Sequence, residues 1–461
     1  MNRENIQFDE SLLQKYSKSG PRYTSYPTAV EFSAEFTLSD YQQQVALSNR
    51  SGAPLSLYFH IPFCDTVCFY CGCNKVVTKD RSKAAPYLER LYRELALQSE
   101  QFDRQRLVTQ LHWGGGTPTF ISHSEMSQLM AQTRQNFTLL DNDEGEYSIE
   151  IDPREVSHES IKLLRSLGFN RMSLGVQDIA PQVQQAVNRI QPADMTRRTL
   201  DWARDEGFKS ISLDLIYGLP FQSVASFSRT LDEVIDIGPD RLAVFNYAHL
   251  PDLFKPQRRI NEADLPQPQQ KLEILQLTID KLTDAGYLYI GMDHFARPDD
   301  ELATAQREGK LYRNFQGYST HADCDLIGIG VTSISQVHHS YSQNIKQSDD
   351  YYAALDQGRL PLLRGIALTE EDRLRCHVIT QLICHFQLQK GAVNQLFKID
   401  FNQHFATELA ALSEMEQDGL LRLEAEQIVV EPRGKLLIRN ICMVFDAYLQ
   451  QKSGQRFSKV I

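Results

Sequence analysis

The sequence predicts an α/β fold, a partial (β/α)6-type barrel with an N-terminal arm and a mostly helical, winged-helix-like C-terminal domain. First, apolar or β-branched runs alternate with helical stretches over short connections, which is typical of parallel β-α units. Second, polar and glycine residues follow each apolar run, as they do at the functional edge of a parallel sheet. Third, prolines and helical patterns replace this alternation beyond residue 250. A doubly wound open sheet is the alternative arrangement of the same units.

The composition is that of an ordinary globular chain. Its 461 residues are 42% hydrophobic and 23% charged, which allows a sizeable core and two or three domains. We predict three parts: an arm over residues 1–50, a barrel over 51–285 and a C-terminal domain over 286–461.

Charge and hydropathy exclude several classes of protein. The net charge of −11 argues against nucleic acid as a partner, because such binding depends on basic contacts to phosphate. The N-terminus lacks the basic and apolar segments of a secretory signal, and no run approaches 18 apolar residues. We expect a cytoplasmic protein with no membrane partner.

The N-terminal 50 residues are polar, and they centre on the segment 21–28, Pro-Arg-Tyr-Thr-Ser-Tyr-Pro-Thr. Pro21 and Pro27 fix φ and disfavour a helix around them, so we predict an extended arm. The arm either packs on the barrel or closes over a site as a lid, and the sequence leaves both possibilities open.

Six strands are predicted in the barrel, and polar side chains follow each of them. The apolar runs lie at 55–60, 107–113, 146–152, 171–176, 210–217 and 241–248, with helices between them such as 84–102, 124–137 and 195–206. Ser122 and Glu125 form a predicted capping box at one helix start. The residues at the strand ends are His60, Gly114–Pro118, Glu150, Asp152, Gln177, Asp178, Asp214 and Asn246–His249. Core packing does not explain polar groups at the same end of six successive strands.

The C-terminal part is predicted to be helical, with one hairpin. Helices lie at 269–285, from 369 onward, at 403–418 and at 434–450, with a strand at 287–292 and a Gly-rich apolar segment at 326–330. Residues 420–423 and 428–431 can pair as a hairpin between the last two helices, which is a winged-helix-like order. This tract has no basic recognition face, so we interpret it as a cover or packing domain.

The most informative motif is a loop with four cysteines, Cys64, Cys68, Cys71 and Cys73. A zinc site needs paired, well-separated ligands, and the second pair is missing. Disulfides are disfavoured in a chain without an export signal. A Cys-x3-Cys-x2-Cys run offers three thiolates to an iron–sulfur cluster. A four-iron cluster held by three ligands keeps one iron open for a substrate.

Other strand-end residues are candidates for ligand binding, and each has a structural alternative. The Gly114–Pro118 turn permits close backbone approach but is not a dinucleotide fingerprint. Glu150 and Asp214 can accept hydrogen bonds from hydroxyl or amino groups, and Arg189 can pair with a carboxylate. Each of the three can also be an ordinary cap, salt bridge or surface charge. We interpret His112 and the isolated Cys324, Cys376, Cys384 and Cys442 as structural.

Several motifs together resemble the oxygen-independent coproporphyrinogen III oxidase family of radical S-adenosylmethionine (SAM) enzymes. The cysteine loop with Tyr58-Phe-His60 before it, the Gly114–Pro118 turn and the arm at 21–28 carry the resemblance. Further matching segments are 151–155, 175–178, 214–220, 246–251, 291–298, 440–443 and 456–461. The resemblance therefore spans essentially the whole chain and implies a radical SAM barrel.

The resemblance implies a specific set of site residues. Cys64, Cys68 and Cys71 are expected to hold a [4Fe–4S] cluster, while Cys73 is not a ligand. Two SAM molecules are expected. Tyr58, His60 and Glu150 are expected to act in catalysis. The predicted cofactor-binding residues are Tyr58, Tyr70, Gly115, Gly116, Thr117, Glu150, Gln177, Arg189, Asp214, Ala248 and Ile334.

The implied reaction is the anaerobic decarboxylation of two propionates of coproporphyrinogen III to vinyl groups, which gives protoporphyrinogen IX. We expect a monomer that takes electrons from a reductant protein the sequence does not name. A substrate with four carboxylates needs a basic patch, and our candidates are Arg22, Arg258, Arg259 and Arg297. The alternatives are a haem chaperone of the same superfamily, a radical methyltransferase and a structural iron–sulfur protein.

Overall fold

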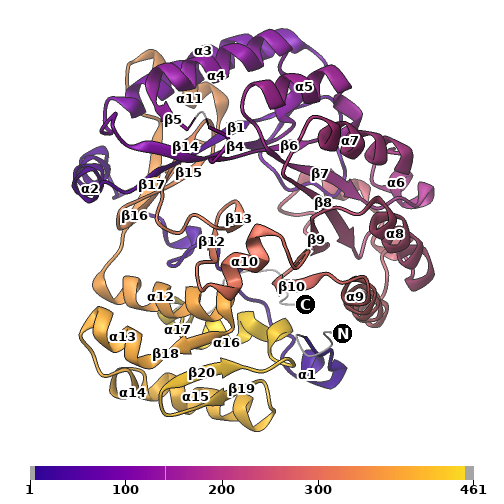
Figure 1. Ribbon diagram of the computed structural model, residues 1–461, viewed down its shortest axis with the longest axis vertical. Coiled ribbons are helices and arrows are strands. Elements are labelled where there is room, and N and C mark those ends of the chain that lie inside the picture. The colour runs from indigo at the N-terminus through magenta and orange to yellow at the C-terminus, as the bar shows by residue number, and fades with distance from the viewer. Residues whose placement is uncertain (1–5, 141, 452–461) are drawn as a thin grey trace.

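A large mixed sheet with helices along its outer side forms most of the molecule (Figure 1). The computed structural model describes residues 6–140 and 142–451. Its central parallel strands are β1 (Leu55–Ile61), β4 (Leu107–Gly115), β6 (Glu146–Ile151), β7 (Arg171–Gln177), β8 (Ser210–Tyr217) and β9 (Arg241–Asn246). All six strands were predicted. The six-unit barrel is confirmed, because these strands pair in chain order and in parallel.

The helices between these strands cover the outer side of the sheet (Figure 1). They are α3 (Ala84–Ser99), α4 (His123–Asn136), α5 (His158–Ser166), α6 (Pro181–Ala186), α7 (Ala193–Asp205), α8 (Val224–Ile237) and α9 (Pro268–Asp284). The predicted capping box is present at α4, where the Ser122 hydroxyl accepts from the Glu125 N–H and Glu125 accepts from the Ser122 N–H. Parallel strands are covered on both faces, which is why β1 is apolar along most of its length.

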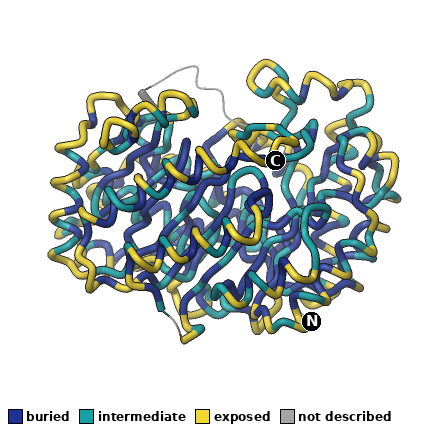
Figure 2. The backbone as a smooth tube through the Cα atoms, turned by 90° about the horizontal axis from the view of Figure 1, so that it is seen from above, coloured by how far each residue is buried: buried dark blue, intermediate teal, exposed yellow. Residues whose placement is uncertain are grey.

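The sheet continues past the predicted domain boundary at 285/286. β10 (Leu288–Gly291) and β11 (His294–Ala296) extend it beside β9, and β14 (Asp325–Ile329) lies parallel to β1 on the other side. Beyond β14 come β15 (Ile334–Val337), β16 (Ser340–Asn344) and β17 (Leu362–Ala367). Figure 2 shows buried segments through the centre of the molecule and exposed segments around its rim.

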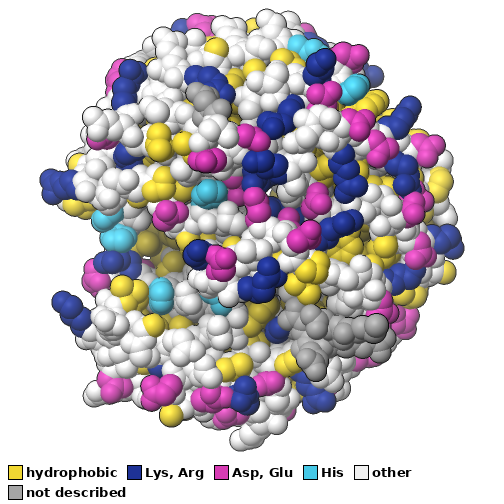
Figure 3. All heavy atoms as spheres, in the orientation of Figure 1, with side chains coloured by type: hydrophobic (Ala, Val, Ile, Leu, Met, Phe, Trp, Pro, Cys, Tyr) yellow, Lys and Arg dark blue, Asp and Glu magenta, His cyan; other side chains and the backbone are white. Residues whose placement is uncertain are grey.

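The rest of the C-terminal part is a helical layer with a small sheet. It contains α12 (Glu370–His385), α13 (Lys390–Phe397), α14 (Phe401–His404), α15 (Ala406–Gln417), α16 (Ile438–Val444) and α17 (Ala447–Gln451). The predicted hairpin is present as β19 (Leu421–Leu423) and β20 (Gln427–Val430), and β18 (Gln387–Gln389) adds a third strand. Charges of both signs are interspersed over the face of the molecule in Figure 3.

The arm differs from its prediction in one respect. α2 (Leu38–Ser51) is a regular helix, where we predicted an irregular segment, and α1 (Glu10–Lys15) precedes it. The Thr37–Asp40 capping box starts α2, and its buried stripe of Tyr41, Val45 and Ser48 is too narrow to stand out in the sequence. The segment 21–28 is free of helix and strand, as predicted, with Tyr23 and Tyr26 buried.

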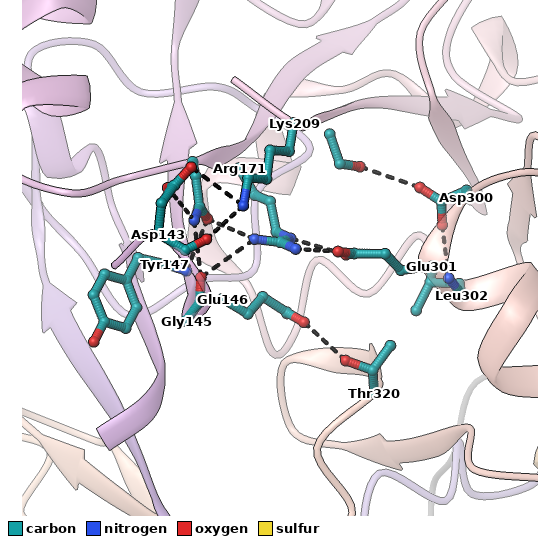
Figure 4. Close-up of polar contacts among 12 residues, drawn as sticks. Asp143, Gly145, Glu146, Tyr147, Arg171, Lys209, Asp300, Glu301, Leu302 and Thr320 are labelled. Carbon is teal, nitrogen blue, oxygen red and sulfur yellow. Dashed lines mark hydrogen bonds and ion pairs between the residues drawn. The ribbon is translucent and has the colours of Figure 1, made fainter. Parts of the chain in front are cut away.

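Ion pairs close the edge of the sheet where the strands begin (Figure 4). Arg171 at the start of β7 pairs with Glu301, and Arg241 at the start of β9 pairs with Asp300 at 2.8 Å. Both carboxylates stand at the beginning of α10 (Glu301–Arg307), whose first turn favours negative charge. This edge is therefore a structural face, and the site lies at the opposite ends of the strands.

A buried carboxylate fixes the sheet behind the end of β1. Glu94 on α3 accepts hydrogen bonds from the Gly330 N–H at 2.8 Å, from Asn344 and from Tyr351, which lies on α11 (Ser348–Asp356). Burial raises the pKa of Glu94 to about 7. Gly330 packs against His60, because a Cβ at Gly330 would lie 2.7 Å from the His60 carbonyl oxygen.

Glu94→Ala is expected to lower the free energy of unfolding by about 3 kcal/mol, since it leaves buried donors without an acceptor. The urea unfolding midpoint measures the loss. Glu89→Ala, an exposed position on the same helix, is the control and is expected to change stability by less than about 0.5 kcal/mol. Equal midpoints for the two variants would contradict the role of Glu94.

No helix within residues 6–140 and 142–451 combines the length and apolar character that a membrane crossing requires.

Candidate functional site

The cysteine loop is held at the ends of the parallel strands. Two short strands close it, β2 (Phe63–Cys64) and β3 (Val76–Val77), which pair in parallel. The loop backbone is bound from outside at three points: the Phe69 N–H donates to the Val187 carbonyl, Asn188 donates to the Val67 carbonyl, and Gln257 donates to the Tyr70 carbonyl. These bonds fix the loop independently of any ligand.

Cys64, Cys68 and Cys71 line one cavity of about 280 Å³. Their Sγ atoms do not all lie within 4.8 Å of one another. Tetrahedral zinc with bonds of 2.3 Å would require sulfur atoms about 3.8 Å apart. The wider spacing suits a polynuclear cluster, whose irons each bind one thiolate. The zinc alternative is therefore disfavoured, and the donor set fits an iron–sulfur cluster.

Basic side chains surround the thiols. Arg154 and Arg189 each donate toward the Cys68 Sγ, at 3.7 and 3.6 Å. Thr117 donates to the Cys64 Sγ at 3.6 Å, and Lys75 donates to the Cys71 carbonyl oxygen at 3.2 Å. Positive charge next to the sulfur atoms favours thiolates, the form that binds iron.

The thiols differ in acidity. Burial raises the pKa of Cys64 to about 11, whereas hydrogen bonding from Cys73 and the nearby Lys75 lower the pKa of Cys71 to about 5. Cys73 is exposed, and its N–H donates to the Cys71 Sγ at 3.4 Å. Cys73 thus contacts a predicted ligand, and the expectation that it does not bind iron stays a prediction.

Most of the predicted cofactor residues meet in this cavity. Eight of them line it: Tyr70, Gly115, Gly116, Thr117, Glu150, Gln177, Arg189 and Asp214. Three do not. Tyr58 lies on β1, Ala248 lines a second cavity, and Ile334 lies on β15 against Gly328, the β14 partner of Tyr58.

The glycine turn after β4 brings backbone close to the loop. A Cβ at Gly116 would lie 2.6 Å from the Phe63 carbonyl oxygen, and Gly115 has a φ of +114° that favours glycine. The Gly115 N–H donates to the Glu150 carboxylate at 3.1 Å. His112, predicted to be structural, bonds Ser148 at 2.5 Å and contacts Glu150 at 3.4 Å.

Two carboxylates of unequal acidity face this cavity. Desolvation works against ionisation of Glu150, but hydrogen bonds from His112 and from the Gly115 N–H keep its pKa below the ordinary value. Desolvation, and then the charge on Glu150, raise the pKa of Asp214 to about 7. Ser173 donates to Asp214 at 3.1 Å. Such a pair suits a ligand that carries positive charge.

Tyr58 and His60 form a hydrogen-bonded pair on β1. Burial lowers the pKa of His60, so its ring is neutral. Its Nε2 lies 3.1 Å from the Asn74 carbonyl and must donate there, which leaves Nδ1 to accept from the Tyr58 hydroxyl at 3.2 Å. Burial also raises the pKa of Tyr58, which keeps the phenol protonated. The two side chains are therefore held in one fixed orientation.

Sequence reasoning assigned no binding role to three residues of the site. Asp152 pairs with Arg189 at 3.0 Å and with Arg154 at 2.7 Å, and Lys75 lines the cavity beside the thiols. Asp152 was recognised as a strand-end residue, and both it and Arg154 belong to the matching segment at 151–155, but the sequence did not indicate their partners. The long-range contacts of Arg154 with Cys68 and of Asp152 with Arg189 reveal their role.

A second cavity, of about 470 Å³, opens beside the first at the ends of β8 and β9. Tyr217, Asn246 and Ala248 line it together with Arg22 of the arm. Of the four candidate arginines only Arg22 lines this cavity. Arg297 donates to the carbonyls of Gly238 and Pro239, and Arg258 donates to the Pro251 carbonyl, while Arg259 lies over the Phe69 ring. The other three candidate arginines do not line this cavity, and the basic patch stays a prediction.

Comparison with known proteins identifies relatives over the full length. Residues 58–234 match the Radical SAM superfamily model, and residues 368–437 match the HemN C-terminal domain model. The chain is 54% identical over 458 residues to an oxygen-independent coproporphyrinogen III oxidase of Pseudomonas aeruginosa, covering 99% of this chain and 100% of the relative. The Escherichia coli enzyme of that name is 51% identical, with both chains fully covered.

A solved structure of coproporphyrinogen III oxidase from Escherichia coli, described as a radical SAM enzyme, superposes with a TM-score of 0.92 at 50% identity. It covers 96% of this chain and 100% of that chain. The similarity includes both the barrel and the C-terminal part.

Proposed function

This chain belongs to the oxygen-independent coproporphyrinogen III oxidase family, and from that membership and its two adjoining cavities we infer how it acts. It catalyses the anaerobic oxidative decarboxylation of two propionate side chains of coproporphyrinogen III, which gives protoporphyrinogen IX in haem biosynthesis. It is a radical SAM enzyme that uses a [4Fe–4S] cluster and SAM.

We assign the cluster to Cys64, Cys68 and Cys71. The supporting observation is that these three thiols face one cavity, are spaced too widely for a single ion and lie beside two arginines. When bound, the cluster and SAM supply a 5′-deoxyadenosyl radical, which takes a hydrogen atom from the propionate before CO2 and one electron leave.

The residues that line the first cavity bind and orient its ligands. Glu150 and Asp214 offer carboxylates to the positive charges of SAM, and the glycine backbone at 115–116 allows its methionine part to approach closely. Arg189 is placed to pair with a ligand carboxylate while it holds Asp152. We propose that a second SAM binds near Ala248 and Ile334, with the Tyr58–His60 pair orienting the reacting groups.

Two further assignments concern partners and location. We propose that the chain acts as a monomer, because described residues of one chain line both cavities. It takes electrons from a reductant protein whose identity the sequence does not specify. We also propose a cytoplasmic location, since cluster assembly on free thiols needs a reducing compartment.

An anaerobic turnover assay tests the function. The reconstituted protein is mixed with dithionite, SAM and coproporphyrinogen III, and the products are quantified. We expect two CO2 and two 5′-deoxyadenosine per protoporphyrinogen IX, and no CO2 when SAM is omitted. Stable haem binding without decarboxylation would instead indicate a haem chaperone, and methylated product would indicate a methyltransferase.

A further inference from the structure

The second cavity contains more positive charge than the proposed function has used so far. Arg22 reaches it from the arm, and its guanidinium forms an ion pair with Asp293 and lies 5.8 Å from the centre of the Phe245 ring. Arg22 is half-buried, with 35% of its side chain exposed. Because Asp293 neutralises the charge of Arg22, Arg22 by itself indicates only that the arm is anchored here.

Arg313 adds a second positive charge beside Arg22. It lies on β12 (Tyr312–Asn314), is 6% exposed, and its Nη1 is buried without a hydrogen-bond partner. Its Nε points to the Arg22 carbonyl oxygen at 3.4 Å, so it lies next to Arg22. Among the described residues Arg313 makes no ion pair, and its guanidinium lies over the Tyr318 ring, 4.9 Å from the ring centre.

Burial and the positive charge of Arg313 together lower the pKa of two neighbouring side chains. Burial, then Arg313 and Arg439, lower the pKa of Arg22 to about 10. Burial, then Arg313 and Arg22, lower the pKa of His294 well below its ordinary value, and the buried His294 Nδ1 has no hydrogen-bond partner. A buried guanidinium without a counter-ion is costly, so this region is built for an anion that arrives with a ligand.

A third arginine fixes the arm that carries Arg22. Arg439 on α16 is 3% exposed, and it donates from Nε to the Pro21 carbonyl at 2.9 Å and from Nη2 to the Gly20 carbonyl. These bonds hold the backbone immediately before Arg22. Arg439 is thus a positioning residue: it sets where the arm places the Arg22 guanidinium.

We propose that Arg22, which lines the second cavity, and Arg313, which is buried next to it outside the cavity lining, form a carboxylate-binding subsite that takes a propionate side chain of the tetrapyrrole substrate. This inference rests on the proposed function, because the ligand is the substrate of that reaction. The planar Arg22 guanidinium can bind a carboxylate through paired N–H donors, and the unpaired charge of Arg313 behind it strengthens the attraction. The subsite anchors one propionate while another lies toward the first cavity.

The test compares the reconstituted holoenzyme with Arg22→Gln and Arg313→Gln. The probe is coproporphyrin III, the stable oxidised form with the same four carboxylates, and its binding is followed by fluorescence under anaerobic conditions. Its uncharged tetramethyl ester is the second probe. Both variants are expected to raise Kd for the acid about tenfold or more and to leave Kd for the ester unchanged. With coproporphyrinogen III, KM is expected to rise more than kcat falls.

Arg297→Gln is the matched control, because Arg297 also holds backbone carbonyls but neither lines the cavity nor donates to the arm at Arg22. It is expected to bind the acid as the unmodified protein does. Unchanged acid affinity in Arg313→Gln would overturn the proposal, and so would an equal loss for acid and ester, which would indicate a structural role.

Iron content and the thermal midpoint of each variant establish that it is folded. Where Arg313→Gln fails to fold, Arg22→Gln carries the test, and it is expected to weaken binding of the acid but not of the ester. Acid binding equal to that of the unmodified protein would overturn the proposal. If the unmodified protein releases no CO2, the proposed function fails; normal turnover with unchanged variant affinities rejects the subsite alone.

Discussion

Cys68→Ala is expected to remove the iron–sulfur cluster and to reduce decarboxylation to background. Cys68 is the most buried of the three proposed ligands, and Arg154 and Arg189 both donate toward its sulfur. Alanine leaves two thiolates for a cluster that needs three protein ligands, and it leaves two guanidinium groups without the negative sulfur they face. Iron and sulfide content after anaerobic reconstitution measures the loss, and CO2 release measures its consequence.

Cys73→Ala is the matched control for this prediction. Cys73 belongs to the same loop but is exposed, and its contact with Cys71 is made by its backbone N–H as well as its thiol. We expect this variant to keep its iron. If Cys73→Ala lost iron to the same extent as Cys68→Ala, the assignment of three ligands would be wrong and a site of four cysteines would be favoured.

Asp214→Asn is expected to weaken SAM binding on the order of tenfold to hundredfold. Asp214 shares the first cavity with Glu150, and the substitution keeps the shape of the side chain while it removes one negative charge from the site of a cationic ligand. Isothermal titration of the reconstituted protein with SAM gives the affinity. Asp201→Asn, an exposed position on α7, is the control and is expected to bind SAM normally.

The same residue predicts how SAM affinity depends on pH. The pKa of Asp214 is raised to about 7, so the carboxyl is mostly protonated at pH 6 and must lose its proton when SAM binds. SAM affinity is therefore expected to be about tenfold weaker at pH 6 than at pH 8, and Asp214→Asn is expected to flatten this dependence. An affinity that is constant between pH 6 and 8 in the unmodified protein would contradict the assignment.

The stability of the SAM-free protein depends on pH in the opposite direction from SAM affinity. Because the folded-state pKa of Asp214 is raised, its contribution to stability is complete below about pH 4 and is lost as the pH rises through about 7. Asp214→Asn is accordingly expected to raise the thermal midpoint of the SAM-free protein at pH 8. The ionised Asp214 carboxylate thus lowers the stability of the SAM-free protein, and binding of a cationic ligand restores it.

Local signals in the sequence were enough for most of the fold. The apolar run at 55–60 became β1, and the capping residues at Ser122 placed the start of α4. The hairpin at 420–430 was predicted from two short apolar runs. α2 was missed because its buried stripe is narrow, although Thr37 and Asp40 carried a capping signal. The segment predicted at 456–461 lies outside the described residues.

The part of the site whose ligands lie close together in the chain could be predicted from the sequence. The spacing of Cys64, Cys68 and Cys71, and the rule that parallel strands end at one edge, were enough to bring Glu150 and Asp214 to the cysteine loop. The sequence could not choose among the arginines, because charge type alone does not say which way a side chain points. Arg22 lines the second cavity, whereas Arg297 caps carbonyls elsewhere.

By itself the sequence determined the β-α order, the cysteine loop and the family, because these depend on periodicity and spacing between near neighbours in the chain. The tertiary structure decided which distant residues meet: Asp152 with Arg189, Glu94 with Gly330, and Arg313 with Arg22 across about 290 positions. Such contacts follow from how the sheet, the arm and the C-terminal part pack on one another. A buried charged side chain indicates a function only when the packing shows whether a group of opposite charge lies beside it.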